Sequence, residues 1–401
     1  MNLKNVDALS ADILDQDLIR IFQPLHLILK LIGCHRVNIN YRFVTAPSIN
    51  QKLYSCIVWL VHALSFVAYV ISCHSILGSA TVDSMVQRSF AINGVLNTAV
   101  AWHNNFCYEN LNSQLYVKLQ RIDRELKLYN TAFLNKMFFV FSVAASLVIT
   151  ASCIAWILLF NFVLATELCL PLFPVLLMSF ANCVEMYLLF HLFIFMIIRV
   201  ITVNNFLRVK LSTYETSKNA DKIKEYMTTN VWSHKTKVNA KIDGFQELVY
   251  GVHRILDALA DVVTLFRFPV LVFASQAFLC NLCLVQCIVD SIKDKVTGGV
   301  HIWEVAVLIN LALGLLLVFV AIIAGILTSK LEETRTLSLY VKSALNDGTA
   351  RDHSKKLLAL LTKERFEISI YNIFVLGYRL PLQMFAITAT YTIVLLQLAT
   401  L

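Results

Sequence analysis

The sequence is long, apolar and weakly charged, which excludes a single water-soluble domain. Its 401 residues are 58% hydrophobic and 15% charged, whereas soluble domains carry about 25% charged and about 45–50% apolar residues. One soluble core could not bury that much apolar surface, so lipid is the expected solvent. A net charge of +8 does not predict nucleic-acid binding, because the basic residues fall in loops between apolar runs.

Apolar runs predict an all-α bundle of seven transmembrane helices. Most of these runs reach the roughly 20 residues that a spanning helix needs. The second run is diluted by Arg88 and several amides, but the charge distribution requires a crossing there. In chain order the predicted spans are 56–80, 86–106, 138–166, 168–198, 268–289, 305–329 and 380–401.

The distribution of Lys and Arg orients the chain with its N-terminus in the cytoplasm and its C-terminus outside the cell. All but five of the 34 basic residues precede the first span or follow the second, fourth and sixth spans, and basic residues beside spans prefer the cytoplasmic side. This orientation is opposite to that of G-protein-coupled receptors. Asp123-Arg124-Glu125 imitates a motif of those receptors, and it is interpreted here as the solvated face of a charged cytoplasmic helix.

The spans and loops divide the chain into six segments. Residues 1–55 form a cytoplasmic segment with an amphipathic helix, 56–200 hold spans one to four and the ligand-binding bundle, and 201–264 form a cytoplasmic helical linker. Residues 265–329 hold spans five and six, 330–379 form cytoplasmic anchor helices, and 380–401 form the last helix. Both long cytoplasmic connections are expected to be helical, because their apolar residues recur at helical intervals. These residues are Leu248, Val252, Ile255, Leu259 and Val262 in the first and, more loosely, Leu357, Leu361, Phe366 and Ile370 in the second.

The last span is predicted to follow a break in a helix. Gly377 permits unusual dihedral angles, and Pro381 removes a backbone donor and disfavours helix at Leu380. The helix is therefore expected to break near 377–381 into a cytoplasmic part and a membrane part. Arg379 at the break would lie at the inner membrane interface.

The last span also carries a motif. Thr390-Tyr391 is followed by five further residues and then by Gln397-Leu398. This pattern resembles the last helix of the insect gustatory receptor family, part of the insect chemoreceptor superfamily, in which Thr-Tyr, five mostly apolar residues and Gln-Phe recur. Leu398 departs from the usual Phe. The resemblance extends through 23–33 and 366–398, and the span layout agrees with it.

The resemblance implies a homotetrameric, tastant-gated, non-selective cation channel in the plasma membrane of gustatory neurons, with permeating cations and membrane lipids as further partners. The last helices line the pore in that family, so Val394 would form an apolar constriction and Gln397 a polar ring near the outer mouth. The spacing is compatible, because residues three apart share a helix face and an apolar ring can gate by dewetting. Thr390, Tyr391 and Leu398 would accompany them.

The resemblance further implies that the ligand pocket lies in the outer half of the bundle made by the earlier helices. Small-molecule sites combine apolar walls with a few placed polar groups, and outer-half residues of both kinds are candidates. They are Asn93, Asn97, Trp156, Phe160, Phe173, Asn182, Glu185, Gln286, Trp303, Glu304 and Asn310. Glu185 is the most unusual, because a carboxylate inside a span is costly and tends to be functional or paired.

The agonist is expected to be a bitter or plant-derived small molecule. Sugars need many hydrogen-bonding partners, and the candidates are richer in aromatic and amide side chains than in carboxylates. Thr392 stands where sugar-sensing members of the family often have Glu.

Enzymatic activity, cofactors and a metal site are not expected. Cys280, Cys283 and Cys287 share a helix face, but zinc prefers four ligands and no matching His or Cys pair lies at that depth. Two alternatives to the channel remain open. One is a secondary transporter with its substrate site at the broken helix, although the two halves of the sequence do not mirror each other. The other is an odorant-receptor-type subunit that requires a co-receptor.

Overall fold

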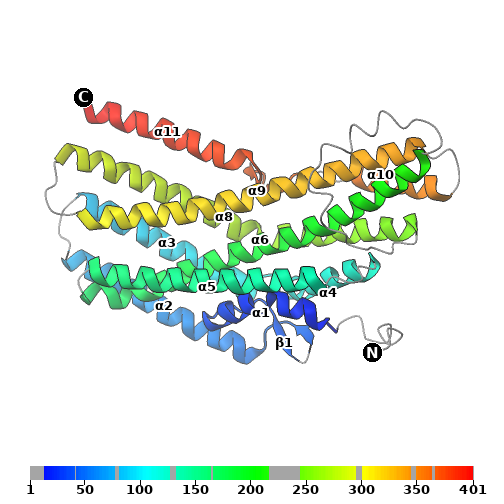
Figure 1. Ribbon diagram of the computed structural model, residues 1–401. Coiled ribbons are helices and arrows are strands. Elements are labelled where there is room, and N and C mark those ends of the chain that lie inside the picture. Colours follow the sequence, from blue (N-terminus) through cyan, green and yellow to red (C-terminus); the bar gives the residue numbers. More distant parts are fainter. Residues whose placement is uncertain are drawn as a thin grey trace.

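The computed structural model describes residues 13–40, 42–76, 81–126, 132–163, 166–215, 244–294, 300–344, 349–363 and 366–400. These residues form an elongated, mostly helical bundle, shown in Figure 1. The helices are α1 (Gln16–Leu31), α2 (Ile49–Ile76), α3 (Thr81–Phe106), α4 (Glu109–Glu125), α5 (Ala132–Val163), α6 (Thr166–Glu215), α8 (Phe245–Asp294), α9 (Val300–Ala344), α10 (Thr349–Lys363) and α11 (Arg379–Thr400). Strands β1 (Asn38–Asn40) and β2 (Phe43–Thr45) form one antiparallel hairpin, and β3 (Ser369–Ile370) and β4 (Phe374–Val375) form another.

Five helices in the described part of the chain carry a stretch long and apolar enough to cross a membrane. The stretches lie in α2, α5, α6, α8 and α9, at Ile49–Ala68, Asn135–Ser152, Ser179–Ser212, Phe245–Gln286 and Leu311–Ala344. They correspond to the first, third, fourth, fifth and sixth predicted spans. Helices α3 and α11 cover the second and last predicted spans, but neither reaches the same measure within the described residues. The multi-pass helical architecture is thus confirmed, while the count of seven crossings and their orientation stay predictions.

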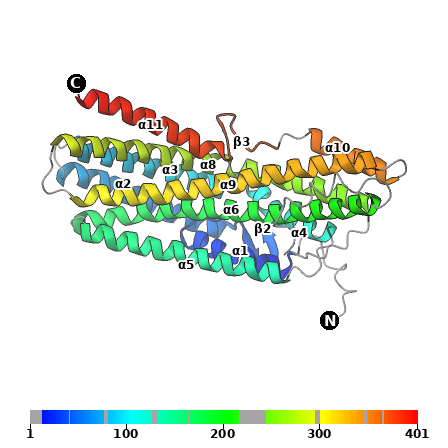
Figure 2. The same ribbon diagram turned by 45° about the horizontal axis from the view of Figure 1, so that its top comes forward.

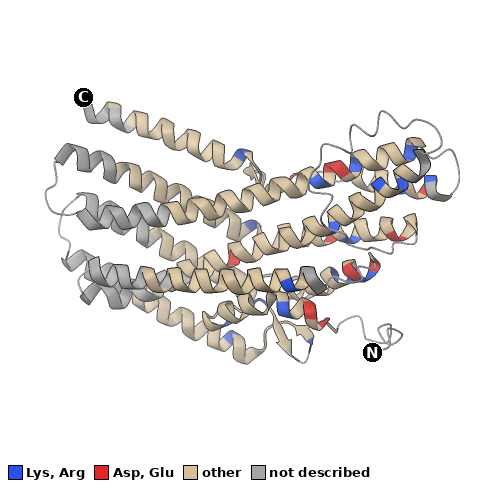
Figure 3. Ribbon diagram, in the orientation of Figure 1, with Lys and Arg blue, Asp and Glu red and all other residues tan. Residues whose placement is uncertain are grey.

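Charge divides the bundle along its length. Figure 3 shows that most of the Lys, Arg, Asp and Glu residues in the described part gather toward the end that holds α4 and α10. The other end is almost free of charge among the described residues, and α11 runs toward it. An apolar half and a charged half are what a membrane layer and a cytoplasmic layer require.

Helix α6 lies at the centre of the bundle. It packs against α1, α2, α3, α5, α8 and α9, and 72% of its apolar stretch is buried. A helix that is apolar on every side is stable only when it is enclosed by other helices or lipid. These six helices therefore enclose α6.

Helix α1 packs its apolar face against α5 and α6. Leu18, Ile21, Phe22, Leu25 and Leu29 are buried, and their spacing of three or four residues places them on one face. Directly after the helix, Gly33 adopts φ 83°, which favours glycine. A Cβ at Gly33 would lie 3.0 Å from Cβ of Val58, so a larger residue would also crowd α2.

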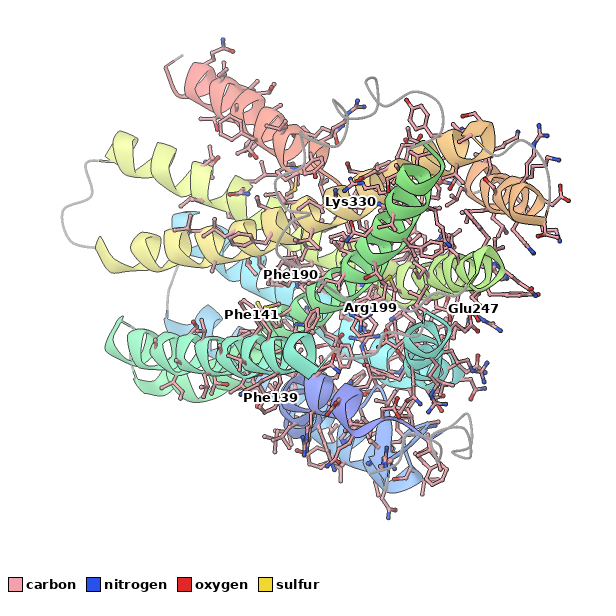
Figure 4. The ribbon with its side chains drawn as sticks, turned by 45° about the vertical axis from the view of Figure 1, so that its right-hand side comes forward. Phe139, Phe141, Phe190, Arg199, Glu247 and Lys330 are labelled. Carbon is pink, nitrogen blue, oxygen red and sulfur yellow. The ribbon has the colours of Figure 1, made fainter. Side chains whose placement is uncertain are left out.

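The charged half is held together by ion pairs from α4. The prediction that Asp123-Arg124-Glu125 forms a solvated face is wrong, because each of the three side chains is at most 31% exposed and pairs with a residue from another segment. The pairs are Asp123 with Arg199 of α6 at 2.8 Å, Arg124 with Asp15 at 3.6 Å, and Glu125 with Arg254 of α8 at 3.4 Å. Figure 4 shows Arg199 among the crowded side chains of the bundle interior.

Lys118 adds a second link between α4 and α8. Its Nζ lies 3.0 Å from a carboxylate oxygen of Asp257 and 2.5 Å from one of Asp261. Partial burial lowers the pKa of Lys118, but the hydrogen bonds to Asp261 and Asp257 outweigh it and raise the pKa above its usual value. The lysine therefore stays charged and holds both carboxylates.

The segment before α11 is a hairpin rather than a helix. Periodicity predicted helix through Phe366 and Ile370, but α10 ends at Lys363 and Ile370 pairs with Phe374 in the β3–β4 hairpin. That prediction is wrong. Tyr371 adopts a positive φ of 49° in the turn, a conformation that no α-helix contains.

The last helix begins within the predicted segment 377–381, but the β3–β4 hairpin precedes it in place of the predicted cytoplasmic part of a broken helix. Helix α11 begins at Arg379, and Pro381 lies in its first turn, where a missing backbone donor breaks no helical hydrogen bond. Leu380 donates its backbone N–H to the carbonyl of Gly377 at 3.1 Å. The hairpin and this turn set the direction in which α11 leaves the bundle.

Candidate functional site

Helix α11 stands apart from the rest of the bundle. Figures 1 and 2 both show it diverging from the other helices toward the C-terminus. Within the described residues it packs mainly against α8, with smaller contacts to α9 and β4. Its exposed apolar side chains run along much of its length and include Leu382, Phe385, Ile387, Tyr391, Ile393 and Val394. Much of the surface of this apolar helix is therefore not covered by its own chain.

The predicted pore residues lie on this uncovered helix. Val394 is 45% exposed, and Gln397, one turn further on, is also exposed. Thr390 donates its hydroxyl to the carbonyl of Ala386 at 2.9 Å. The side chain of Leu398 lies outside those that the structure describes. The structure thus places Val394 and Gln397 where another protein surface or a pore could face them.

A second group of predicted residues meets inside the bundle, between α3, α6 and α8. The amide of Asn97, which is 1% exposed, donates from Nδ2 to Oγ of Ser179 at 2.7 Å. Its Oδ1 accepts a hydrogen bond from Nε2 of Gln276 at 2.7 Å and another from Nδ2 of Asn182. We call Asn97, Ser179, Asn182 and Gln276 the amide cluster. Asn97 and Asn182 were predicted as candidates, and they come from α3 and α6.

Sequence reasoning missed Gln276. It lies in α8 four residues before Cys280, so both share a helix face. An amide inside an apolar run is a polar group that needs a buried partner, and that signal could have placed Gln276 beside Asn97.

Asn93 borders the amide cluster one turn away along α3. Its Nδ2 donates to Sγ of Cys280 at 3.4 Å, and its backbone carbonyl accepts from Gln276 at 3.4 Å. Its Oδ1 is buried and has no hydrogen-bond partner among the described residues. A buried acceptor without a partner is costly, and a hydroxyl or amine of a bound ligand would satisfy it.

Glu185 was a candidate for ligand contact, but its carboxylate is paired. Arg36 donates from Nε to Oε2 of Glu185 at 2.7 Å, and both side chains are at most 3% exposed. The other guanidinium nitrogens donate to Oδ1 of Asn112 at 3.2 Å and of Asn104 at 2.9 Å. Arg36 also lies 4.3 Å from the ring centre of Phe266. Glu185 therefore holds the bundle together through Arg36.

The structure says little about the remaining ligand-binding candidates. Gln286 lies near the end of α8 and is partly exposed. The remaining side chains lie outside those that the structure describes: Trp156, Phe160, Phe173, Trp303, Glu304 and Asn310. No group of His, Cys, Asp or Glu side chains in the described part of the chain could hold a metal ion.

The comparisons with known proteins decide the family. A sequence profile described as 7tm chemosensory receptor matches residues 22–400. The chain belongs to this family. The resemblance to insect chemoreceptors inferred from the last span is thereby confirmed, and this is a family of receptors rather than of enzymes. No curated protein sequence matches the chain.

Two solved structures resemble this chemosensory receptor over nearly its whole length. The insect olfactory receptor OR5 from Machilis hrabei gives a TM-score of 0.66 at 12% identity, over 96% of this chain and 100% of that one. The same receptor in complex with eugenol gives a TM-score of 0.63 at 12% identity with the same coverage. At this identity the likeness shows the fold.

The amide cluster predicts a difference between two neighbouring asparagines. Replacing Asn97 by Leu removes its hydrogen bonds with Gln276, Asn182 and Ser179, and a buried polar group that loses its partner costs about 1–3 kcal/mol. Asn97→Leu should therefore lower the melting temperature of the purified receptor clearly. Asn93→Leu is the matched control on the same helix and should lower it much less, because Oδ1 of Asn93 is unpaired. Equal melting temperatures for the two variants would contradict the cluster.

The buried ion pair predicts strong coupling between two distant positions. Arg36→Met or Glu185→Leu alone leaves one buried charge unpaired, which costs about 3–5 kcal/mol. The double variant removes both charges and should be no less stable than the worse single variant. Thermal unfolding of all four proteins measures the cycle. Additive losses of stability would exclude a direct pair.

Proposed function

We propose that this receptor is a gustatory-type, tastant-gated, non-selective cation channel in the plasma membrane, formed by four copies of the chain around their α11 helices. The observation that carries the proposal is the uncovered α11. It is an apolar helix that its own chain contacts on a limited surface, and it presents Val394 and Gln397 on exposed positions. Family membership and the Thr390-Tyr391…Gln397 motif support the same assignment.

The polarity of α11 favours a pore over a lipid-facing position. Its threonine hydroxyls donate hydrogen bonds to backbone carbonyls of the same helix. Thr388 donates to the carbonyl of Met384, and Thr392 donates to the carbonyl of Thr388. Gln397 presents its polar amide on an exposed position of the same helix, and exposed polar side chains are costly against lipid. A water-filled pore lined by four copies would hydrate it. Val394, one turn before it, would then form an apolar ring able to gate by dewetting.

The agonist in this proposal is an apolar molecule with few polar groups, such as a bitter or plant-derived compound. Support comes from the site itself: the amide cluster and Asn93 offer neutral hydrogen-bonding groups, and the carboxylate of Glu185 is occupied by Arg36. A sugar would need more partners than these residues provide. A receptor of the same fold has been solved with eugenol, a ligand of the proposed class.

The direct test is a voltage-clamp recording from cells that express this chain alone. A panel of plant alkaloids, phenolics and sugars should include agonists that evoke currents reversing near zero in mixed cations. Saturable uptake without conductance would instead identify a carrier. Currents that appear only after a co-receptor is added would identify an odorant-receptor-type subunit and would contradict the homotetramer.

Gln397→Ala should alter ion selectivity. Removing the amide ring takes away groups that face permeating ions, so the relative permeability of Na⁺, K⁺ and Ca²⁺ should change while agonist sensitivity stays within about twofold. Reversal potentials under bi-ionic conditions measure this. Gln246→Ala, the same change on the exposed cytoplasmic start of α8, serves as the control. Unchanged permeability ratios in the Gln397 variant would exclude a pore role for this residue.

Val394→Ala should open the channel without ligand. A smaller side chain widens and hydrates an apolar ring, which lowers the barrier to ions in the closed state. Basal current, normalised to surface expression, should rise several-fold over the wild type. Ile393→Ala changes the neighbouring exposed residue on a different side of α11 and should leave the basal current low. A silent Val394 variant would refute the assignment of the gate.

A further inference from the structure

A cavity lies between α1 and the first hairpin, and its walls include no residue of the amide cluster or of α11 among those described. Its volume is about 510 Å³. Its walls come from one side of α1, the loop that follows this helix, strand β1 and the first turn of α2. A cavity of this size lies within the range of small-molecule sites.

Among the described residues, the cavity is lined by basic side chains and by no carboxylate. Arg20 and Lys30 come from α1, Arg36 from the loop, and Arg42 from the turn between the strands. The charge of Arg36 is compensated by Glu185. Arg20 and Lys30 are exposed and form no ion pair with the described residues, and Arg42 donates from Nε to the carbonyl of Leu14 at 2.9 Å. Three positive charges therefore line the cavity without an acidic partner in the part of the chain that the structure describes.

Two histidines in the wall contribute hydrogen-bonding capacity but little charge. Burial, and then Arg36, lowers the pKa of His26 to about 4. Burial and then Lys30 also lower the pKa of His35. Nε2 of His26 is buried and has no hydrogen-bond partner among the described residues. A neutral imidazole can donate one hydrogen bond to an anion.

The cavity lies where the apolar surface of the bundle begins. Gln51 in its wall belongs to the first turns of α2, and the exposed apolar residues of that helix start beside it with Leu53 and Ile57. Leu27 of the wall and Leu31 are also exposed. Tyr54 donates its hydroxyl to the carbonyl of Leu31 at 2.8 Å, which ties the end of α1 to α2. A cationic hollow thus borders a strip of lipid-facing side chains.

We propose that this cavity binds a phosphate-bearing anion at the cytoplasmic face of the membrane, and that the headgroup of an anionic phospholipid is its ligand. The uncompensated cations match phosphate oxygens, which basic pockets on the cytoplasmic side of membrane proteins recognise. The adjoining leucines fit an acyl chain, which a free phosphate lacks. The site is independent of the proposed channel function, since it uses none of its residues.

The test is a binding measurement on the purified full-length receptor in phosphatidylcholine nanodiscs. The probe is a fluorescent phosphatidylinositol 4,5-bisphosphate, competed by unlabelled phosphatidylserine, by the soluble headgroup inositol trisphosphate or by inorganic phosphate. Each basic residue near an anionic lipid contributes roughly a fivefold factor, so Arg20→Gln/Lys30→Gln should bind the probe at least about tenfold more weakly. Both residues are exposed, and size-exclusion profiles check that the variant folds.

A matched control removes two charges elsewhere. Lys355→Gln/Lys356→Gln changes two exposed lysines of α10 and should bind the probe within about twofold of wild type. Much stronger competition by phosphatidylserine than by the soluble headgroup inositol trisphosphate supports a phospholipid as the ligand. Equal competition by inorganic phosphate supports a phosphate site but overturns the lipid. Wild-type affinity in the Arg20/Lys30 variant, or an equal loss in the control, overturns the site itself.

Discussion

The contact between Arg36 and Glu185 is the constraint on which the arrangement of the bundle depends. A buried carboxylate in a central helix is costly unless a partner of opposite charge neutralises it. Arg36 does so from the loop after α1, and it also binds Asn104 of α3 and Asn112 of α4 while lying over Phe266 of α8. One guanidinium therefore fixes the N-terminal segment and four helices relative to one another. The N-terminal segment is part of the bundle, and the basic cavity beside α1 exists because this segment is held in place.

The same contact shapes the chemistry available to a ligand. With one carboxylate oxygen of Glu185 bonded to Arg36, the amide cluster and its neighbours Asn93 and Cys280 offer neutral amides, a hydroxyl and a thiol between α3, α6 and α8. Amides satisfy one another and leave few free groups, of which Oδ1 of Asn93 is one. A site of this kind selects ligands by shape and by one or two hydrogen bonds. That character agrees with the expectation of an apolar agonist.

The sequence predicted the features that depend on neighbouring residues in the chain. It missed those that depend on partners far away in the sequence. Hydropathy located the long helices, since each span needs only its own apolar residues. The same principle marked Glu185 as paired or functional, but its partner lies 149 residues away and was counted as an ordinary cytoplasmic charge. The prediction that Asp123-Arg124-Glu125 forms a solvated face was wrong for the same reason, because all three partners come from other segments. The β3–β4 hairpin was missed because Phe366 and Ile370 continue the loose helical spacing of Leu357 and Leu361, although α10 ends at Lys363.

Helix α8 joins the two regions that the proposed channel must couple. It carries Gln276 of the amide cluster and Cys280, which Asn93 contacts, and it is the main packing partner of α11. Coupling between separated sites needs a rigid element that both sites bias, and one continuous helix meets that need. A ligand that reorganises the hydrogen bonds of Gln276 acts on α8 directly. Any resulting shift of α8 reaches α11 across their shared surface, whereas the hairpin anchors only the inner end of α11. In the proposed channel, the limited packing of α11 within its own chain would let the helix move with α8 along one side while its other side faces the pore.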